Sequence, residues 1–280
     1  MCKKYKLQGG FILAIIDMLE EMHTYGRNWC EERGFHYIGA RYITPDNDVG
    51  PPFVVKDIIP SMDSNLVNNP SEIAHMSQQH AINRGSQPMK STFTFEESIE
   101  NTTTTSTTHG VSANVSITST TSFKIRFVEQ SIEVNIGAEY NYSKTEEITE
   151  SKSQGWSESI EVIIPPQTKV TTTYFVMKGP YNLPIDLKCT MIGDFEMEYS
   201  RIPNGSRATE VIPVGKIVIA NNTPGFKRPE HAYAPAYYKG VTALKGDVGI
   251  ESFVEVVEEP LSGNGEIKTY KIPLTKSSLK

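Results

Sequence analysis

The sequence is poor in cysteine, lacks a long apolar run and carries no excess of positive charge. Its 280 residues include three cysteines (Cys2, Cys30 and Cys189), an odd and sparse number that provides no disulfide framework. No run of about 18 apolar residues occurs, so the sequence offers no candidate for a transmembrane helix. With 27 basic and 33 acidic residues, the net charge is −6, which argues against a general affinity for nucleic acid.

The motifs of common enzyme active sites are also missing. There is no phosphate-binding glycine loop, no paired-cysteine motif and no nucleophile elbow. The six histidines are scattered, and the spacing of His75 and His80 is not that of a zinc protease. Neighbouring carboxylates such as Glu146 and Glu147 lie in polar stretches and are typical of solvated faces. We therefore predict that the protein is not an enzyme and that it uses no metal or cofactor.

The most informative stretch runs from Val111 to Tyr142 and alternates between apolar and polar residues in two parts. Apolar residues occupy odd positions as far as Phe127 and even positions from Ile132 onward, and polar residues occupy the other set. Alternation with a period of two places the two sets on opposite faces of a strand. The change of parity predicts a turn at residues 128–131 and therefore a β-hairpin.

One register satisfies both faces of this hairpin. On the polar face it brings Arg126 opposite Glu133, an oppositely charged cross-strand pair. The apolar face stops where Lys144 would lie opposite Val115, which leaves two strands of 11 residues each, Ile117–Phe127 and Ile132–Tyr142. The predicted pairs on the apolar face are Phe127–Ile132, Ile125–Val134, Phe123–Ile136, Thr121–Ala138 and Ile117–Tyr142.

Two interpretations of the hairpin stay open. It matches tilted transmembrane β-strands of about 9–11 residues with a water-filled lumen on the polar side. Equally, it matches the edge of a soluble β-sandwich whose apolar face covers the core. In the membrane interpretation, a charge at Ile136 is expected to abolish pores and leave the soluble fold largely intact. The lipid face then consists of Ile117, Phe123, Ile125, Phe127, Val128, Ile132, Val134, Ile136, Ala138 and Tyr140, and the lumen is lined by Lys124, Arg126, Glu133 and Glu139.

The composition changes near residue 90, which divides the chain into residues 1–90 and 91–280. Between Ser91 and Ser122, 18 of the 32 residues are Ser or Thr, and residues 143–161 are again polar. The first tract is either a disordered linker or an extended strand. If both tracts are strands, they form two polar stems that run antiparallel beneath the hairpin and bury little apolar surface.

Residues 1–90 contain all but one of the predicted helix segments. The first residues imitate a signal peptide, but no small-residue cleavage site follows, and we interpret them as an amphipathic helix. That helix buries Phe11, Ile15, Met18, Leu19 and Met22, and Ser71–Asn83 is a second candidate. Aromatic residues follow the first helix and belong either to the core or to an exposed binding patch. The candidates for binding are Tyr25, Trp29, Tyr37 and Tyr42.

The second half reads as further strands. Residues 241–259 are interpreted as a strand pair broken by glycine, and 231–238 as a loop. A last strand, Glu266–Pro273, is expected to cover an otherwise open sheet edge within residues 260–280. Proteolysis at its lysines then exposes the edge; the alternative is an ordinary terminal strand that the fold requires.

Several motifs resemble the epsilon-toxin and mosquitocidal-toxin branch of the aerolysin-type pore-forming proteins. Within this branch the sequence resembles parasporal crystal proteins of Bacillus, including parasporin-type toxins and non-toxic crystal homologues. It covers about Phe93–Leu187, and weakly Gly240–Glu259. The motifs are the Ser/Thr-rich strand before His109-Gly110, the alternating stretch to Phe123-Lys124-Ile125, Tyr140-Asn141-Tyr142-Ser143, Gly155-Trp156-Ser157, Val162–Pro166 before Thr168, and Gly179–Pro184.

The resemblance implies an elongated, mainly β fold with long twisted antiparallel strands and a β-hairpin tongue at 111–142. It further implies that residues 1–90 bind a cell-surface receptor, which is a protein, a glycan or a lipid-anchored molecule, and that residues 91–280 form the pore. After proteolysis, a homo-oligomer, expected to be a heptamer, inserts the tongue into the target membrane. The protein is then stored in a parasporal crystal or secreted by a spore-forming bacterium. A non-toxic storage protein of the same fold and a lectin-like carbohydrate-binding module remain alternatives.

Overall fold

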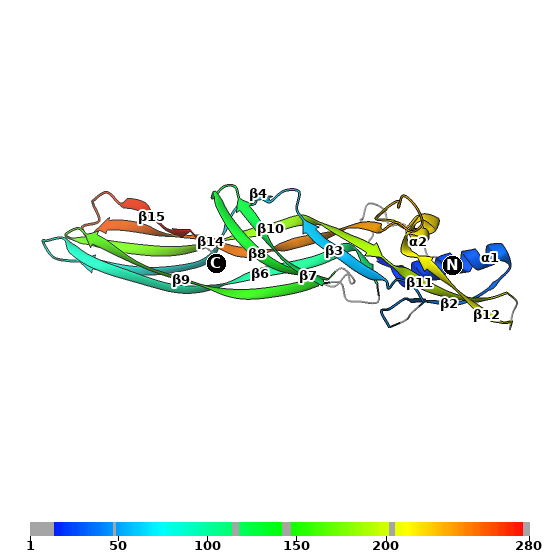
Figure 1. The fold of residues 1–280 in the computed structure, drawn as a ribbon. Helices are drawn as coiled ribbons and strands as arrows, with labels where there is room; N and C mark the ends of the chain where they lie inside the picture. Colours follow the sequence, from blue (N-terminus) through cyan, green and yellow to red (C-terminus); the bar gives the residue numbers. More distant parts are fainter. Residues whose placement is uncertain (1–13, 47–48, 114–117, 142–146, 202–204, 277–280) are drawn as a thin grey trace.

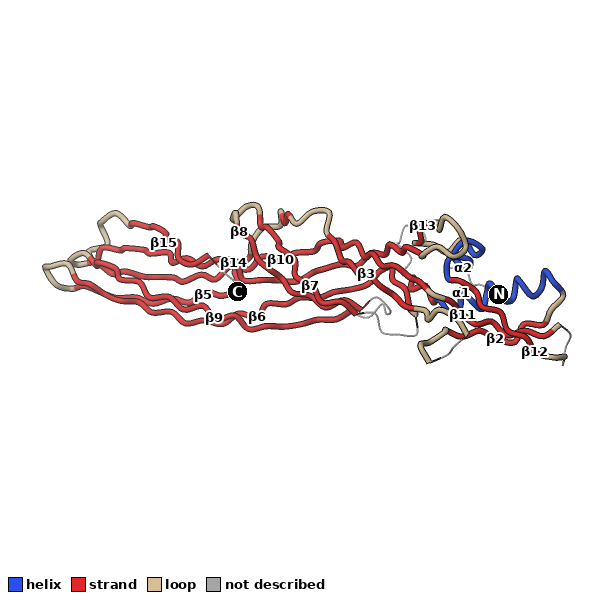
Figure 2. Tube along the Cα trace, in the orientation of Figure 1, coloured by secondary structure: helices blue, strands red, loops and turns tan. Residues whose placement is uncertain are grey.

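The computed structural model describes residues 14–46, 49–113, 118–141, 147–201 and 205–276 of the chain. They form an elongated rod of long strands, with two helices gathered at one end (Figure 1). In the tube view the same strands run along most of the rod, and a hairpin crosses them near its middle (Figure 2). The predicted elongated, mainly β fold with long antiparallel strands is confirmed.

A nine-stranded sheet forms the body of the rod. Its strands are β1 (Ala14–Asp17), β3 (Val54–Ser61), β5 (Glu72–Asn83), β6 (Met89–Ser112), β9 (Glu147–Ile164), β10 (Thr168–Ile192), β13 (Phe226–Lys227), β14 (Ala236–Pro260) and β15 (Lys268–Lys276). The central order is β1-β6-β14-β10-β3, while β9 pairs with β6, β5 with β10, and β13 and β15 with β14. Only β1 and β6 run parallel among these pairs of described strands.

Two smaller sheets complete the fold. The tongue sheet, in the order β4-β7-β8, lies across the middle of the body (Figure 1). The sheet β12-β11-β2 and the two helices form one end of the rod, which we call the head. The elements are β4 (Leu66–Val67), β7 (Thr118–Phe127), β8 (Ile132–Asn141), β2 (His36–Tyr42), β11 (Asp194–Ser200), β12 (Arg207–Pro213), α1 (Met18–Arg33) and α2 (Val214–Asn221).

The two polar tracts of the sequence are ordered strands. β6 and β9 pair antiparallel from Met89–Ile164 to Ser106–Glu147, as predicted for the two stems. Hydroxyl groups meet across this pair, with Ser98 and Ser153 at 2.6 Å and Thr104 and Thr149 at 2.9 Å between oxygens. These contacts lie at exposed positions, so the stems are joined by hydrogen bonds and bury little side-chain surface there.

β10 takes part in two separate cores, because different stretches of this strand bury opposite faces. The register against β14 shifts between Met177 and Lys178. Before the shift, Val176 and other even-numbered residues are buried in the core at the end of the rod opposite the head, which we call the tail. After it, the odd-numbered residues from Gly179 are buried, with Tyr181, Leu183 and Ile185 in the core that includes the tongue. The extra residue is Ile250 of β14, which has no partner in β10. An inserted residue reverses the facing of later side chains in its own strand, so even-numbered residues of β14 reach both cores, Leu244 beneath the tongue and Val254 in the tail.

The two predicted helices are corrected by the structure. The first helix begins only at Met18, where the Asp17 carboxylate accepts hydrogen bonds from the amides of Leu19 and Glu20. Ile15 lies in β1, which pairs with β6, and Phe11 lies outside the described residues. The stretch Ser71–Asn83 is not helical: residues 72–83 form β5, because pairing with β10 outweighs local propensity.

Residues 241–259 are also corrected: they belong to the single continuous strand β14 and are not a broken pair. Its glycines serve close packing. A methyl group at Gly246 would lie 2.0 Å from the carbonyl oxygen of Thr102, and one at Gly249 would lie 2.5 Å from Ile99. Glycine therefore permits β6 to approach β14, whereas in the sequence it resembled a turn signal.

The composition change at residue 90 does not coincide with a break in the sheet. β3 and β5, which precede it, both pair with β10, and β5 is joined to β6 by the short connection 84–88. Cys30 and Cys189 are buried free thiols, in agreement with the expected lack of a disulfide framework, and Cys2 lies outside the described residues.

Candidate functional site

The predicted hairpin is present as β7 and β8. The turn lies at residues 128–131, where Ser131 adopts a left-handed φ of 54°. Ile117 and Tyr142 lie outside the described residues. The other predicted pairs are confirmed, namely Phe127–Ile132, Ile125–Val134, Phe123–Ile136, Thr121–Ala138 and Arg126–Glu133.

The apolar face of the hairpin is buried against the body. Phe123 is partly buried, whereas Val128 lies in the turn and is 43% exposed, outside the buried face. Below the hairpin lie apolar side chains of β10 and β14, among them Leu183 and Leu244. The fully or almost fully buried side chains of the hairpin are Ile125, Phe127, Ile132, Val134, Ile136, Ala138 and Tyr140.

Phe127 fits onto the body because position 179 has no side chain. A methyl group at Gly179 would lie 2.4 Å from the ring of Phe127, so any larger residue forces the hairpin tip away from β10. Tyr181 lies on the same face of β10 and donates a hydrogen bond to the carbonyl oxygen of Thr102 (3.1 Å). Burial raises the pKa of Tyr181 to about 12, so this donor keeps its proton at neutral pH.

Polar contacts tie β8 to β6. The hydroxyl of Thr105 donates to the carbonyl oxygen of Glu139, and that of Thr107 donates to the carbonyl oxygen of Asn141, both at 2.8 Å. Each such hydrogen bond contributes about 1 kcal/mol net. The two hydrogen bonds together therefore contribute only about 2 kcal/mol to holding β8 on β6.

A segment that sequence analysis missed closes the outer edge of the hairpin. We call residues 62–71, which connect β3 and β5, the strap. Its β4 pairs parallel with β7: the Asn65 carbonyl accepts from the amide of Arg126 (2.8 Å), and the Val67 carbonyl accepts from that of Val128 (3.0 Å). The side chain of Asn69 also donates to the carbonyl oxygen of Pro180 (3.2 Å). The strap thus holds the hairpin tip to the body on its free edge.

The polar face of the hairpin points to solvent. Lys124, Arg126, Glu133 and Glu139 are all exposed, which agrees with the predicted division of faces. Arg126 lies opposite Glu133 in the register, but the ion pair of Glu133 is with the diagonal Lys124 at 3.3 Å. Both side chains of this pair are more than half exposed, so it adds little to stability.

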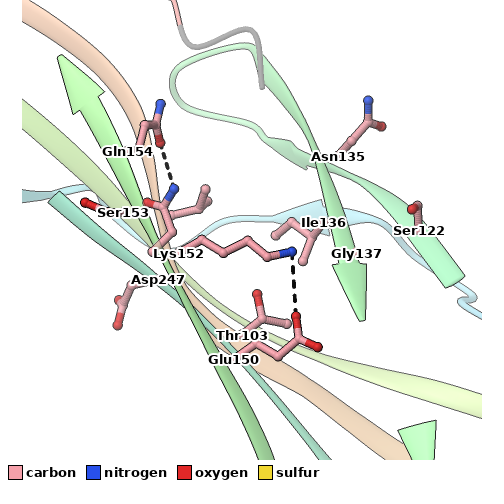
Figure 3. A pocket seen from close by; sticks show the side chains of 12 residues that line it. Thr103, Ser122, Asn135, Ile136, Gly137, Glu150, Lys152, Ser153, Gln154 and Asp247 are labelled. Carbon is pink, nitrogen blue, oxygen red and sulfur yellow. Dashed lines mark hydrogen bonds and ion pairs between the residues drawn. The ribbon is translucent and has the colours of Figure 1, made fainter. Parts of the chain in front are cut away.

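A polar cavity of about 400 Å³ separates part of the hairpin from the stems (Figure 3). Ser122, Asn135 and Gly137 of the hairpin line one side, at the right in the figure, and residues of β6, β9 and β14 line the other. On the stem side Lys152 lies 3.6 Å from Glu150. The hairpin therefore packs closely at its tip and loosely above the stems.

The candidate receptor-binding aromatics divide into two groups. Tyr25 and Tyr42 are buried, with 6% and 8% of their surface exposed, and so form part of the core of the head. Trp29 and Tyr37 are half-buried at the surface. Trp29 packs edge-on against Tyr199 (5.1 Å between ring centres), and the Arg33 guanidinium lies 4.4 Å above its ring.

The predicted last strand exists as β15, displaced to Lys268–Lys276. It pairs with residues 251–258 of β14, beyond the part of β14 that pairs with β6. Ile272 and Leu274 pack on the tail core, while most of the strand is exposed. β15 therefore covers an edge of β14 that β6 leaves open.

The described residues show neither a cluster of three or more potential metal ligands nor a helix long and apolar enough to cross a membrane.

Comparison with known proteins supports the toxin resemblance. Residues 32–270 match the family described as Clostridium epsilon toxin ETX/Bacillus mosquitocidal toxin MTX2. The pesticidal crystal protein Cry15Aa of Bacillus thuringiensis subsp. thompsoni is 30% identical over 212 residues. The match covers 71% of this chain and 62% of Cry15Aa, so the chain spans less than two thirds of that relative's length.

Two solved structures share the fold. A non-toxic crystal protein from Bacillus thuringiensis has a TM-score of 0.78 at 24% identity, covering 90% of this chain and all of the other. The Mpp75Aa1.1 β-pore-forming protein from Brevibacillus laterosporus has a TM-score of 0.56 at 16% identity, covering 94% and 95%. The family match covers most of the chain, which therefore belongs to the Clostridium epsilon toxin ETX/Bacillus mosquitocidal toxin MTX2 family and has the fold of aerolysin-like pore-forming toxins.

Proposed function

We propose that the protein is a pore-forming toxin that binds a cell-surface receptor, assembles into a ring of seven copies after proteolysis and inserts the tongue as a membrane-spanning β-barrel. The observation that carries this proposal is the two-faced tongue. Its apolar face already contacts apolar surface and its polar face already contacts water. On insertion the apolar face leaves the protein core and contacts lipid, and the polar face leaves bulk water and contacts the water in the lumen. Each face therefore stays in surroundings of the polarity that suits it.

The function is tested by dye release from receptor-bearing cells before and after trypsin treatment. Release that requires trypsin and grows with protein concentration supports the proposal. Similarity to a non-toxic crystal protein favours a second candidate, a storage protein of the same fold. That candidate predicts no release from any cell type under either condition. In both cases we place the protein in a parasporal crystal or in the secreted fraction of a spore-forming bacterium, in line with its similarity to crystal proteins.

The lumen assignment predicts a change of ion selectivity. Lys124, Arg126, Glu133 and Glu139 contribute no net charge per subunit, and Glu139→Lys changes this to +2. Because rings of charge set ion selectivity, we expect the reversal potential across a salt gradient to shift toward anions. Glu230→Lys, at an exposed position outside the tongue, is the matched control. An unchanged reversal potential in Glu139→Lys would place this residue outside the lumen.

We propose that β15 is an inhibitory cover over the edge of β14. Unpaired strand edges pair readily with other chains, so removal of β15 favours assembly. A chain truncated after Glu259 is expected to stay folded and to form rings on membranes without protease, whereas the full chain requires trypsin cleavage at sites such as Lys268 and Lys271. Circular dichroism and detergent-resistant oligomers on gels provide the readout. A truncated chain that folds but still needs trypsin contradicts the cover.

We propose that the head carries receptor recognition, through Trp29 and Tyr37 in place of the buried Tyr25 and Tyr42. Trp and Tyr commonly anchor interfaces. Trp29→Ala is expected to weaken cell binding about tenfold or more, measured by flow cytometry with labelled protein, with melting temperature as a check on the fold. Tyr233→Ala is the comparison; this residue is 83% exposed in the loop that precedes β14, which is shorter than the predicted loop 231–238 because residues 236–238 belong to β14. Loss of binding in this second variant alone moves the site to that loop.

A further inference from the structure

One exposed face of the body is rich in lysine although the chain as a whole is acidic. Across β3, β10 and β14, Ile59 lies beside Lys188, which lies beside Lys239. These residues form one row across the strands. In the next row, Thr190 of β10 pairs with Lys56 on one side and with Tyr237 on the other, and Tyr237 pairs in turn with Lys227 of β13. Because cross-strand partners share a face, the two rows form one surface. We call this surface the basic face; its members are Lys56, Ile59, Lys188, Thr190, Lys227, Tyr237 and Lys239.

The charges of the basic face are only partly neutralised. Lys188 and Lys239 are directly opposite one another, an arrangement of like charges that is unfavourable in a sheet. Lys239 is paired with Asp186 at 2.7 Å, and the hydrogen bond to this carboxylate and its charge raise the pKa of Lys239. Asp57 also borders the face, and Asp63 acts on Lys239 from nearby. Within the described residues, Lys56, Lys188 and Lys227 form no ion pair.

The basic face also exposes large apolar side chains around a groove. Ile59 is 55% exposed and Tyr237 is 49% exposed. With Lys188, Lys227 and Lys239 they line a groove of about 320 Å³. Lysine next to exposed aromatic and aliphatic residues is the combination found at membrane interfaces, where the rings lie at headgroup level and the ammonium groups reach the phosphates.

We propose that the basic face binds the headgroups of anionic phospholipids and thereby captures the protein on a membrane surface. The exposed aliphatic Ile59 favours a lipid over an acidic glycan, because sugars are recognised by aromatic rings and polar groups, whereas an aliphatic side chain gains by leaving water at the lipid interface. The tongue packs on the opposite face of β10, through residues such as Leu183 and Ile185. Contact through the basic face therefore leaves the tongue docked, and this site serves capture before insertion.

The test uses the full chain without trypsin treatment, so that binding is measured apart from pore formation. Protein is sedimented with vesicles of phosphatidylcholine alone and of phosphatidylcholine with phosphatidylserine. Wild type is expected to bind the mixed vesicles at least about tenfold more strongly, and to lose this preference at high salt. Lys188→Glu/Lys227→Glu is expected to abolish the preference. Lys90→Glu/Lys152→Glu, which changes the net charge equally at exposed positions of the stems, is expected to retain it.

A second variant separates lipid contact from general electrostatic attraction. Ile59→Ser/Tyr237→Ser keeps every charge and is expected to weaken binding severalfold while the salt dependence persists. Equal binding of wild type to both kinds of vesicle overturns the proposal, as does equal loss in the stem control. Binding to sulfated glycan beads but not to vesicles also overturns it and assigns the face to a glycan. Pore formation plays no part in this assay, so its outcome is independent of the proposed toxin activity.

Discussion

Replacing Thr121 with lysine is expected to abolish pore formation, whereas the same replacement at Ser122 should preserve it. The two residues are neighbours on opposite faces of β7: Thr121 is half-buried opposite Ala138, and Ser122 is exposed opposite Gly137. Thr121 lies near the centre of the predicted membrane strand 117–127. A lysine at the bilayer midplane on the lipid face costs about 2–4 kcal/mol, repeated in every subunit of a ring, while a lysine in the lumen stays hydrated.

The measurement is dye release at fixed protein concentration, with circular dichroism and thermal unfolding as checks on the soluble fold. Even in a single subunit the cost corresponds to a loss of about 30-fold or more in insertion equilibrium. Equal release by the Thr121→Lys and Ser122→Lys proteins would show that the two faces are wrongly assigned. Complete loss in both would show that β7 does not line a water-filled lumen.

The variants at Thr121 and Ser122 test the membrane-facing side of the hairpin better than a charge at Ile136 does. From the sequence, a charge at Ile136 was expected to leave the soluble fold largely intact. That expectation is wrong for the docked tongue, because Ile136 is only 5% exposed and belongs to the main core. A carboxylate there is buried without a partner and destabilises the soluble protein as well as the pore. Thr121 avoids this problem because it is already polar and half-exposed.

Joining the strap to the tongue by a disulfide is expected to block pore formation reversibly. Leu66 and Arg126 are partners in the parallel pair of β4 and β7, and both are exposed. Neighbouring strands lie about 4.8 Å apart, within the Cα separation that a disulfide spans. In oxidised Leu66→Cys/Arg126→Cys the tongue tip cannot leave the strap, so dye release should fall to background and return after reduction.

The two native thiols that the structure describes are not expected to compete in this experiment. Cys30 and Cys189 are buried, and burial raises the pKa of Cys189 to about 12, so it forms little thiolate. Each single cysteine variant controls for loss of the side chain. Glu198→Cys/Thr209→Cys, across β11 and β12 in the head, controls for disulfide formation away from the tongue. Undiminished release from the fully oxidised strap–tongue protein would mean that the tongue inserts while its tip stays on the strap.

The hairpin could be predicted in detail because its pattern is strong and doubly constrained. Alternation fixed the faces, and the change of parity between Phe127 and Ile132 fixed the turn and the register together. The mistaken helix at 71–83 carries no such pattern, and long-range pairing with β10 decides its structure. α2 was missed because its sequence, VGKIVIAN, is short and rich in β-branched residues that favour strands.

The strap could not be predicted for a different reason. Only Leu66 and Val67 form its strand, too few to show a period, and its contacts with β7 use backbone atoms that any residue provides. The aromatic candidates illustrate the same limit. Their residue types predicted either core or surface, and only tertiary packing separates Tyr25 and Tyr42 from Trp29 and Tyr37. Composition alone therefore identified the aromatic region as a candidate for binding, but it could not show which of its aromatic side chains reach the surface.

The burial of opposite faces of β10 in the two cores has a consequence for how the protein can open. Because β10 buries one face in the tail and the other beneath the tongue, the two apolar clusters share a strand but not a face. Departure of the tongue uncovers Leu183 and Ile185 while Tyr174 and Val176 stay sealed between the layers of the tail. Release of the tongue is therefore expected to be a sub-global opening that leaves the tail folded.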